Sequence, residues 1–188
     1  MSLDPHPPLR KHPPMPPDID LRTHIRAIPD FPQPGIVFRN ITPLLHEPAA
    51  FRAANEQLAE IARSFDATLI AGIEARGFLF GTPVAERLNL PFVPIRKPGK
   101  LPADRASVFY ELEYGHDSLE LHRDPSVDRH RVVIVDDLLA TGGTAAAAAQ
   151  LVEELGGTVA GYAFVIELDA LEGRARLDGH SVQALLHY

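Results

Sequence analysis

Apolar residues recur along the chain in two alternating patterns. In some segments they are spaced three or four residues apart, which is typical of one face of an amphipathic helix. In others they form short continuous runs, which are typical of strands buried on both faces of a parallel sheet. The helical pattern covers residues 47–65, 80–88, 143–157 and 170–178. The buried-strand pattern covers residues 67–73, 91–95, 132–137, 158–168 and 181–187. Strands that alternate with helices in this way predict a largely parallel α/β sheet.

The N-terminal part departs from this alternation. Residues 1–17 contain seven prolines and few apolar side chains, so they are interpreted as a flexible leader outside the fold. Residues 18–188 are expected to form one domain, because domains commonly contain about 100–200 residues. Within it, the spacing of Leu21, Ile25 and Ile28 predicts a helix that the following prolines end.

Period-two alternation predicts two strands near the middle of the chain. Val108, Tyr110 and Leu112 alternate with other residues, and so do Leu119 and Leu121. The sequence EYGHD lies between them. This part therefore predicts a β-hairpin or a flexible flap.

Composition and charge narrow the class of protein. The chain has 188 residues, of which 45% are apolar and 23% charged, as in ordinary globular proteins. The formal net charge of −7 argues against a nucleic-acid partner. The chain has no cysteine, and its nine histidines show no tight metal-ligand spacing, so no protein metal site is predicted. No apolar run is long enough to cross a membrane, and the expected location is the cytosol.

The sequence VVIVDDLLATGGT, residues 132–144, carries the clearest chemical signal. A predicted buried strand ends in Asp136 and Asp137, and a loop of small and hydroxyl residues then leads into a helix. Ligands of parallel α/β sheets bind beyond the carboxyl ends of the strands. A helix N-terminus offers free backbone N–H groups and a positive dipole end to an anion. The loop lacks the lysine of a nucleoside-triphosphate-binding P-loop, so it suits a monophosphate better.

The carboxylates of Asp136 and Asp137 repel each other, so their adjacent positions in the sequence need an explanation. An ionised carboxylate only accepts hydrogen bonds. Two of them beside a phosphate loop would suit the vicinal hydroxyls of a ribose 5-phosphate. The alternative is that the acids cap the following helix and that the glycines form an ordinary turn.

The same stretch resembles the phosphoribosyl pyrophosphate (PRPP) motif of the type I phosphoribosyltransferases. Four further segments resemble successive parts of the adenine phosphoribosyltransferase family: DFPQPGIVFRNITPLL (30–45), GIEARGFLFG (72–81), IRKPGKLP (95–102) and YELEYG (110–115). The resemblance implies a central, mostly parallel sheet flanked by helices, with a small hood and a flexible hairpin flap. It also implies a pentosyltransferase of purine salvage, which converts adenine and PRPP to AMP and pyrophosphate, and a homodimer.

The resemblance assigns roles to particular residues. Asp136 and Asp137 would face the ribose hydroxyls. The 5-phosphate would be held by Ala140, Thr141, Gly142, Gly143 and Thr144. The cations for pyrophosphate would be Arg76, Arg96, Lys97 and Lys100. In the family, the loop that contains Arg76 often has a non-proline cis peptide. Mg²⁺ would be bound mainly through PRPP and water, as suits an ion that gives up its hydration shell reluctantly.

The base-binding segment and the flap follow from the same resemblance. Phe38 would stack on adenine, backbone groups of Val37 and Arg39 would bind its edge, and Leu138 would close the other face. In the flap, Glu113 would act near the purine N7, and Tyr114 would shield the site. Asn40 stands where the family usually has aspartate, which removes a negative charge near the expected base site.

Two other functions remain open at this stage. A phosphoribosyltransferase for hypoxanthine, guanine or xanthine would want a donor, often a lysine, for the oxo group at C6. A regulator that senses PRPP and binds nucleic acid would need a basic face or an added DNA-binding segment.

Overall fold

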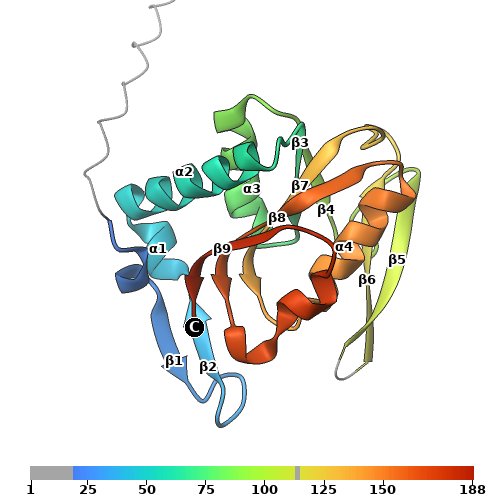
Figure 1. Cartoon of the computed structure of the whole chain (residues 1–188). Helices are drawn as coiled ribbons and strands as arrows, with labels where there is room; N and C mark the ends of the chain where they lie inside the picture. The colour runs from blue at the N-terminus through green and yellow to red at the C-terminus, as the bar shows by residue number, and fades with distance from the viewer. Residues whose placement is uncertain (1–18, 113–114) are drawn as a thin grey trace, which may run out of the picture.

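The computed structural model describes residues 19–112 and 115–188 (Figure 1). The expected leader over residues 1–17 lies outside these ranges, as do Glu113 and Tyr114.

The centre of the fold is a five-stranded parallel sheet. Its strands are β3 (Leu69–Ile73), β4 (Phe92–Ile95), β7 (Arg131–Leu139), β8 (Thr158–Glu167) and β9 (Val182–His187). Their order is β4-β3-β7-β8-β9, and all four pairings are parallel. The predicted fold class, a mostly parallel sheet flanked by helices, is confirmed.

Three helices cover the two faces of this sheet. They are α2 (Pro48–Ser64), α3 (Gly77–Leu88) and α4 (Gly143–Glu154). Ile70 of β3 packs into a core with α2 and α3, whereas its neighbours Leu69 and Ala71 pack into a second core with α4. Successive strand residues point to opposite faces, so an unbroken apolar run is required to fill both cores. The predicted helix at 47–65 is confirmed within a residue at each end, and Gly156 follows α4 with φ +85°.

The N-terminal part of the described chain forms a small hood. It contains a 3₁₀ helix, η1 (Leu21–His24), the strands β1 (Arg26–Pro29) and β2 (Val37–Asn40), and helix α1 (Thr42–His46). The helix predicted from Leu21, Ile25 and Ile28 is wrong after its first turn, because Ile25 adopts an extended backbone and β1 pairs antiparallel with β2. That pairing joins Arg26 to Asn40 and Pro29 to Val37, and a local helical pattern does not reveal it.

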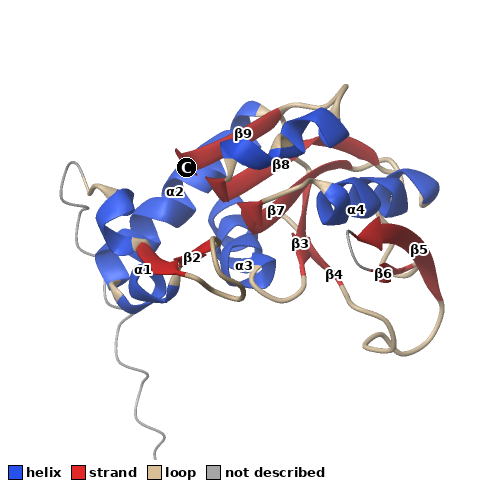
Figure 2. Cartoon of the chain, turned by 90° about the horizontal axis from the view of Figure 1, so that it is seen from below, coloured by secondary structure: helices blue, strands red, loops and turns tan. Residues whose placement is uncertain are grey.

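The predicted hairpin is present as β5 (Arg105–Leu112) and β6 (Gly115–His122). Figures 1 and 2 both show it beside α4, at the end of the molecule opposite to the hood. The helix expected near 170–178 is instead two 3₁₀ segments, η2 (Asp169–Leu171) and η3 (Gly173–Leu177). Within the described ranges, no helix combines the length and apolar character that a membrane span requires.

Candidate active site

A pocket of about 260 Å³ lies at the carboxyl ends of β3 and β7. It is lined by the acid pair, by the loop into α4 and by residues from the loops after β3 and β4. Its lining comprises Ile73, Glu74, Arg76, Lys97, Asp136, Asp137, Leu138, Leu139, Ala140, Thr141, Gly142, Gly143, Thr144, Ala145 and Phe164. Every residue expected to hold ribose or its 5-phosphate is therefore in this one lining, together with Arg76, Lys97 and Leu138.

The loop after β7 lines the pocket and leads into the N-terminus of α4. Gly142 is the N-cap residue of α4, and as a glycine it has no side chain that could cap the helix. Its φ of +81° lies in the left-handed region, which glycine adopts at little cost. A Cβ at this position would overlap the carbonyl oxygen of Gly173. The close approach of η3 and the positive φ together explain why the loop has glycine here.

The two aspartates lie in different surroundings. Asp137 is 2% exposed, and its Oδ2 lies 2.9 Å from Nε of Arg76. This contact is a charge pair without hydrogen-bond alignment, so Oδ2 has no hydrogen bond within the described residues. The backbone N–H of Asp137 donates to Oδ1 of the half-buried Asp136 at 2.8 Å. Both carboxylates line the pocket, and a carboxylate can accept more hydrogen bonds than these contacts use, which suits hydroxyl donors.

Burial governs the acidity of this pair. It raises the pKa of Asp136 well above the ordinary value, and the neighbouring charge of Asp137 raises it further. Burial also raises the pKa of Asp137, although Arg76 opposes this effect. The ligand-free site therefore holds negative charge at a cost that hydroxyl donors would reduce.

Glu74 organises the cationic loops around the pocket. Its Oε2 accepts from Nε of Arg96 at 3.0 Å and from the backbone N–H of Lys97 at 2.8 Å. The bonds from Arg96 and Lys97 lower the pKa of Glu74. The peptide between Glu74 and Ala75 is cis, which is the feature that the resemblance implied for this loop. Arg96 is thus already paired with a carboxylate, and Lys100 is exposed outside the pocket lining.

The β5–β6 hairpin brings the side chains of Tyr110 and Asp117 to the edge of the pocket. The Tyr110 hydroxyl lies 3.3 Å from Nζ of Lys97, 3.1 Å from Oδ2 of Asp117 and 3.4 Å from Oγ1 of Thr144. Lys97 also forms an ion pair with Asp117. These contacts join Lys97, the β5–β6 hairpin and the start of α4, where Thr144 lies.

Three of the expected base-binding residues, Val37, Phe38 and Arg39, lie on strand β2, outside the lining of this pocket, whereas Leu138 is part of it. Val37 is 44% exposed. The half-buried Phe38 has the guanidinium carbon of Arg76 5.9 Å from its ring centre, so it borders the pocket through Arg76. The guanidinium carbon of Arg39 lies 4.0 Å from the ring centre of Tyr188, so its side chain packs on the residue after β9.

Asn40 has a structural partner. Its Oδ1 accepts from the backbone N–H of Thr42 at 2.9 Å and from the Thr42 hydroxyl at 2.7 Å. Aspartate would accept the same bonds at the start of α1. The substitution of asparagine at this position is therefore compatible with the same local structure.

Sequence reasoning missed several residues of the site. Glu74 follows directly after β3, and the rule that placed Asp136 and Asp137 at a strand end would have found it. Tyr110 and Asp117 were missed because the sequence EYGHD was interpreted as the connection between the strands. In the structure β6 already begins at Gly115, which places Asp117 directly opposite Tyr110.

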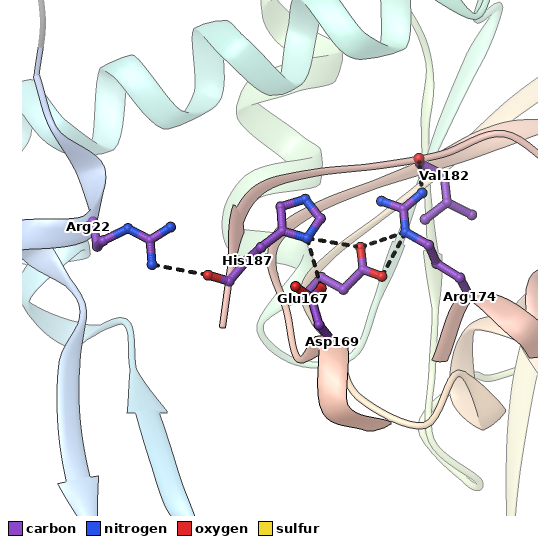
Figure 3. A network of polar contacts seen from close by, with 6 residues as sticks. All are labelled: Arg22, Glu167, Asp169, Arg174, Val182 and His187. Atoms are coloured by element: carbon purple, nitrogen blue, oxygen red, sulfur yellow. Dashed lines mark hydrogen bonds and ion pairs between the residues drawn. The ribbon is translucent and has the colours of Figure 1, made fainter. Parts of the chain in front are cut away.

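A second polar network lies at the ends of β8 and β9, on the side of the hood (Figure 3). Glu167, Asp169 and His187 are close enough together to ligate a cation. However, both carboxylate oxygens of Glu167 accept from Nε of Arg174, at 2.7 and 2.9 Å, and Asp169 contacts His187 at 2.9 Å. Arg22 donates to the carbonyl of His187 at 3.0 Å. This network therefore ties η1 and η3 to the sheet.

Comparison with known proteins agrees with this geometry. Residues 40–185 match the phosphoribosyl transferase domain family. An adenine phosphoribosyltransferase from Gloeobacter violaceus is 57% identical over 90% of this chain and 100% of its own length. A crystal structure of the enzyme from Thermoanaerobacter pseudethanolicus is 54% identical, with a TM-score of 0.86 over 89% of this chain and 98% of that one.

The chain belongs to the adenine phosphoribosyltransferase family. A more distant adenine phosphoribosyltransferase, from Saccharomyces cerevisiae, is 40% identical, with a TM-score of 0.83 over 88% of this chain and 96% of that one. Its crystal structure contains adenine and D-2,5-dideoxy-2,5-imino-altritol 1,6-bisphosphate. The fold that carries the pocket is thus shared with an adenine phosphoribosyltransferase that binds adenine beside a phosphorylated sugar analogue.

Proposed function

We propose that this chain is an adenine phosphoribosyltransferase, which transfers the 5-phosphoribosyl group of PRPP to adenine and releases pyrophosphate. The product is AMP, so the activity is one of purine salvage. The observation that carries the proposal is that all residues expected to hold ribose and its 5-phosphate line one pocket. The identity to adenine phosphoribosyltransferases over nine-tenths of the chain supports adenine as the base.

The pocket residues would act by positioning and by charge. Backbone N–H groups of residues 140–144 bind the 5-phosphate at the positive end of α4. Asp136 and Asp137 accept from the ribose hydroxyls. As the bond from C1 of ribose to pyrophosphate breaks, positive charge develops on the sugar, and the buried carboxylates stabilise it. Arg76 and Lys97 balance the charge that accumulates on the departing pyrophosphate.

Mg²⁺ fits the donors of this pocket. Asp136, Asp137 and Glu74 line the pocket, but Asp137 is paired with Arg76 and Glu74 accepts from Arg96 and Lys97, so the ion would be held mainly through PRPP and water. Hard oxygen donors of this kind suit Mg²⁺, which usually keeps several waters and binds substrate phosphates. When bound, the ion would neutralise charge on PRPP and pyrophosphate. The protein side chains would then orient the substrate around it.

The hood and the flap would complete the base site. Phe38 stacks on adenine, and Leu138, which lines the pocket, packs against the other face. Backbone groups of Val37 and Arg39 bind the edge of the base. Adenine loses a proton as its N9 bonds to C1 of ribose. Glu113 therefore acts at the purine N7 as an acceptor that positions adenine in AMP synthesis, or as a proton donor in the reverse reaction, in which pyrophosphate splits AMP. To donate near neutral pH, its pKa must rise when the flap excludes water.

Assembly and location follow from the family alone. We expect a cytosolic homodimer, with no nucleic-acid or membrane partner. Light scattering of the purified protein measures the oligomeric state directly.

Incubation with PRPP and Mg²⁺, with one base in each reaction, tests the function. Chromatography of the products separates AMP from the nucleotides of hypoxanthine, guanine and xanthine. AMP from adenine alone is the expected result. A product from an oxopurine alone would overturn the base assignment but leave the PRPP site in place. No product from any base, with PRPP still bound, would favour a regulator.

A further inference from the structure

Lys97 lines the pocket while a carboxylate from the hairpin already neutralises it. Its ammonium group pairs with Asp117 of β6 and contacts the hydroxyl of Tyr110 of β5. The two side chains are partly exposed, at 37% for Lys97 and 26% for Asp117. Burial lowers the pKa of Lys97, but the hydrogen bonds and charges of Asp117 and Tyr110 together raise it above its ordinary value. Both partners are therefore charged at neutral pH.

The pair is also connected to the phosphate loop. Tyr110 and Asp117 are directly opposite each other in the β5–β6 ladder, and the Tyr110 hydroxyl donates to Asp117. The same hydroxyl oxygen lies within 3.4 Å of the Thr144 hydroxyl in the loop that lines the pocket. The hairpin is thus attached to the PRPP pocket at two points, Lys97 and Thr144.

Arg96 offers a contrast within the same loop. Its guanidinium pairs with Glu74, which follows the central strand β3 rather than the hairpin. The backbone of Arg96 pairs with that of Glu120 in β6, but the carboxylate that pairs with its guanidinium lies outside the hairpin, whereas the carboxylate that pairs with Lys97 lies on it. Only the second pair links the charge of the pocket to the position of the hairpin.

We propose that Asp117 is an internal counter-ion that competes with pyrophosphate for Lys97. In the free enzyme Lys97 is paired with Asp117, and the entering pyrophosphate group of PRPP displaces this carboxylate. Asp117 and Tyr110 are then positioning residues that set the affinity for PRPP and pyrophosphate. This inference rests on the proposed phosphoribosyl transfer and assigns to the hairpin a control of anion binding.

The physical basis is the difference in charge between the two anions. A carboxylate carries one negative charge, whereas pyrophosphate carries several and offers more acceptor oxygens to an ammonium group. The exchange of Asp117 for pyrophosphate at Lys97 is therefore favourable. However, the Lys97–Asp117 pair must first be broken, and this cost weakens the binding of pyrophosphate. Without the internal carboxylate, binding of pyrophosphate should be tighter.

Asp117→Asn tests the proposal with little change in shape. The Asn Oδ1 can still accept the bond that the backbone N–H of Ser118 donates to Asp117 at 2.8 Å. We expect the KM for PRPP and the inhibition constant of pyrophosphate to fall by about two- to fivefold, as for a partly exposed ion pair. We expect kcat to change by less than about twofold, because adenine and the reacting atoms are not contacted.

Asp104→Asn is the matched control. It removes the same charge from an 82% exposed side chain that pairs with Arg123, not with Lys97. Its KM for PRPP should stay at the wild-type value. Equal KM values for the two variants would overturn the proposal, since the effect would then be one of net charge or would be absent.

A double-mutant cycle separates the role of Lys97 from a general loosening of the hairpin. In a Lys97→Gln background, Asp117→Asn should no longer improve binding of pyrophosphate. An undiminished improvement would refute the competition for Lys97. Thermal unfolding of each variant confirms that it is folded. Failure of the proposed function looks different, because the wild-type protein would then form no AMP from adenine and PRPP.

Discussion

Replacement of Gly142 by alanine tests how the phosphate loop is held. Two separate penalties arise at this position. A left-handed backbone costs a non-glycine residue roughly 1–2 kcal/mol, and φ of Gly142 is +81°. The new Cβ would also overlap the carbonyl oxygen of Gly173 and lie 3.2 Å from Cβ of Arg176. Forcing a methyl group into a packed site costs roughly 1–3 kcal/mol.

Two other glycines isolate these penalties. Gly179 has φ +89°, and a Cβ there would meet none of the described atoms within 4 Å, so Gly179→Ala should lose roughly 1–2 kcal/mol from the backbone alone. Gly173 has no positive φ, but its Cβ would overlap the carbonyl oxygen of Ala140, so Gly173→Ala should lose roughly 1–3 kcal/mol from the clash alone. Gly142→Ala combines both penalties, for a total of roughly 2–5 kcal/mol.

Thermal unfolding of the three variants measures the comparison. For a protein of this size, each kcal/mol lowers Tm by about 2–4 °C, so Gly142→Ala should lower Tm by roughly 4–20 °C. The KM for PRPP should rise in Gly142→Ala and stay unchanged in Gly179→Ala, because only Gly142 lines the pocket. Equal losses of Tm in these two variants would refute the clash with η3. A wild-type KM for PRPP in Gly142→Ala would refute the phosphate role of the loop.

Three further predictions concern the acid pair, the hood and the flap. Asp136→Asn should raise the Tm of the free protein by about 2–4 °C at pH 8, for a gain of about 1 kcal/mol, and should weaken PRPP binding. Burial raises the pKa of Asp136 in the folded state, so protonation of Asp136 stabilises the wild-type protein at low pH, and this stabilisation is lost as the pH rises. The gain in Tm of Asp136→Asn should therefore be smaller at pH 5 than at pH 8. Equal gains at both pH values would contradict this origin. Tyr188→Leu should raise the KM for adenine about three- to tenfold, because the ring under Arg39 is lost, and it should leave the KM for PRPP unchanged. Tyr188→Phe keeps the ring and should behave as wild type. Equal effects of the two variants would exclude a role for the ring. Glu113→Gln should lower kcat far more than it changes PRPP binding, as single-turnover kinetics would measure, and unchanged turnover would remove Glu113 from the chemistry.

The central sheet and the PRPP pocket could be predicted because each depends on short stretches of sequence. A strand buried on both faces must be apolar at every position, so β7 is visible as VVIVDD without knowledge of its neighbours. The carboxyl end of such a strand is also where parallel sheets bind ligands. Asp136, Asp137 and the loop to Thr144 therefore follow from one segment and one topological rule.

The hood and the hairpin register could not be predicted in the same way. Ile25 fits a helical stripe, but the pairing of β1 with β2 provides its backbone with an extended alternative. Asp117 was placed in a turn, and its facing of Tyr110 depends on where the turn begins. A strand that shifts by one residue turns every side chain to the other face. The proposed competition for Lys97 thus depends on a register that only the structure supplies.

The acid pair shows how the chain combines stability with binding. Two neighbouring carboxylates, the buried Asp137 and the half-buried Asp136, destabilise the free protein. The half-exposed Arg76 offsets part of this cost, most directly for Asp137, at 2.9 Å. A hydrophobic or amide side chain at either position would make a more stable fold. In the proposed reaction the ribose hydroxyls would donate hydrogen bonds to this pair, and the sugar would become more positive as pyrophosphate leaves. The carboxylates would then be least favourable in the empty pocket and most favourable in the transition state, which is the difference in free energy that catalysis requires.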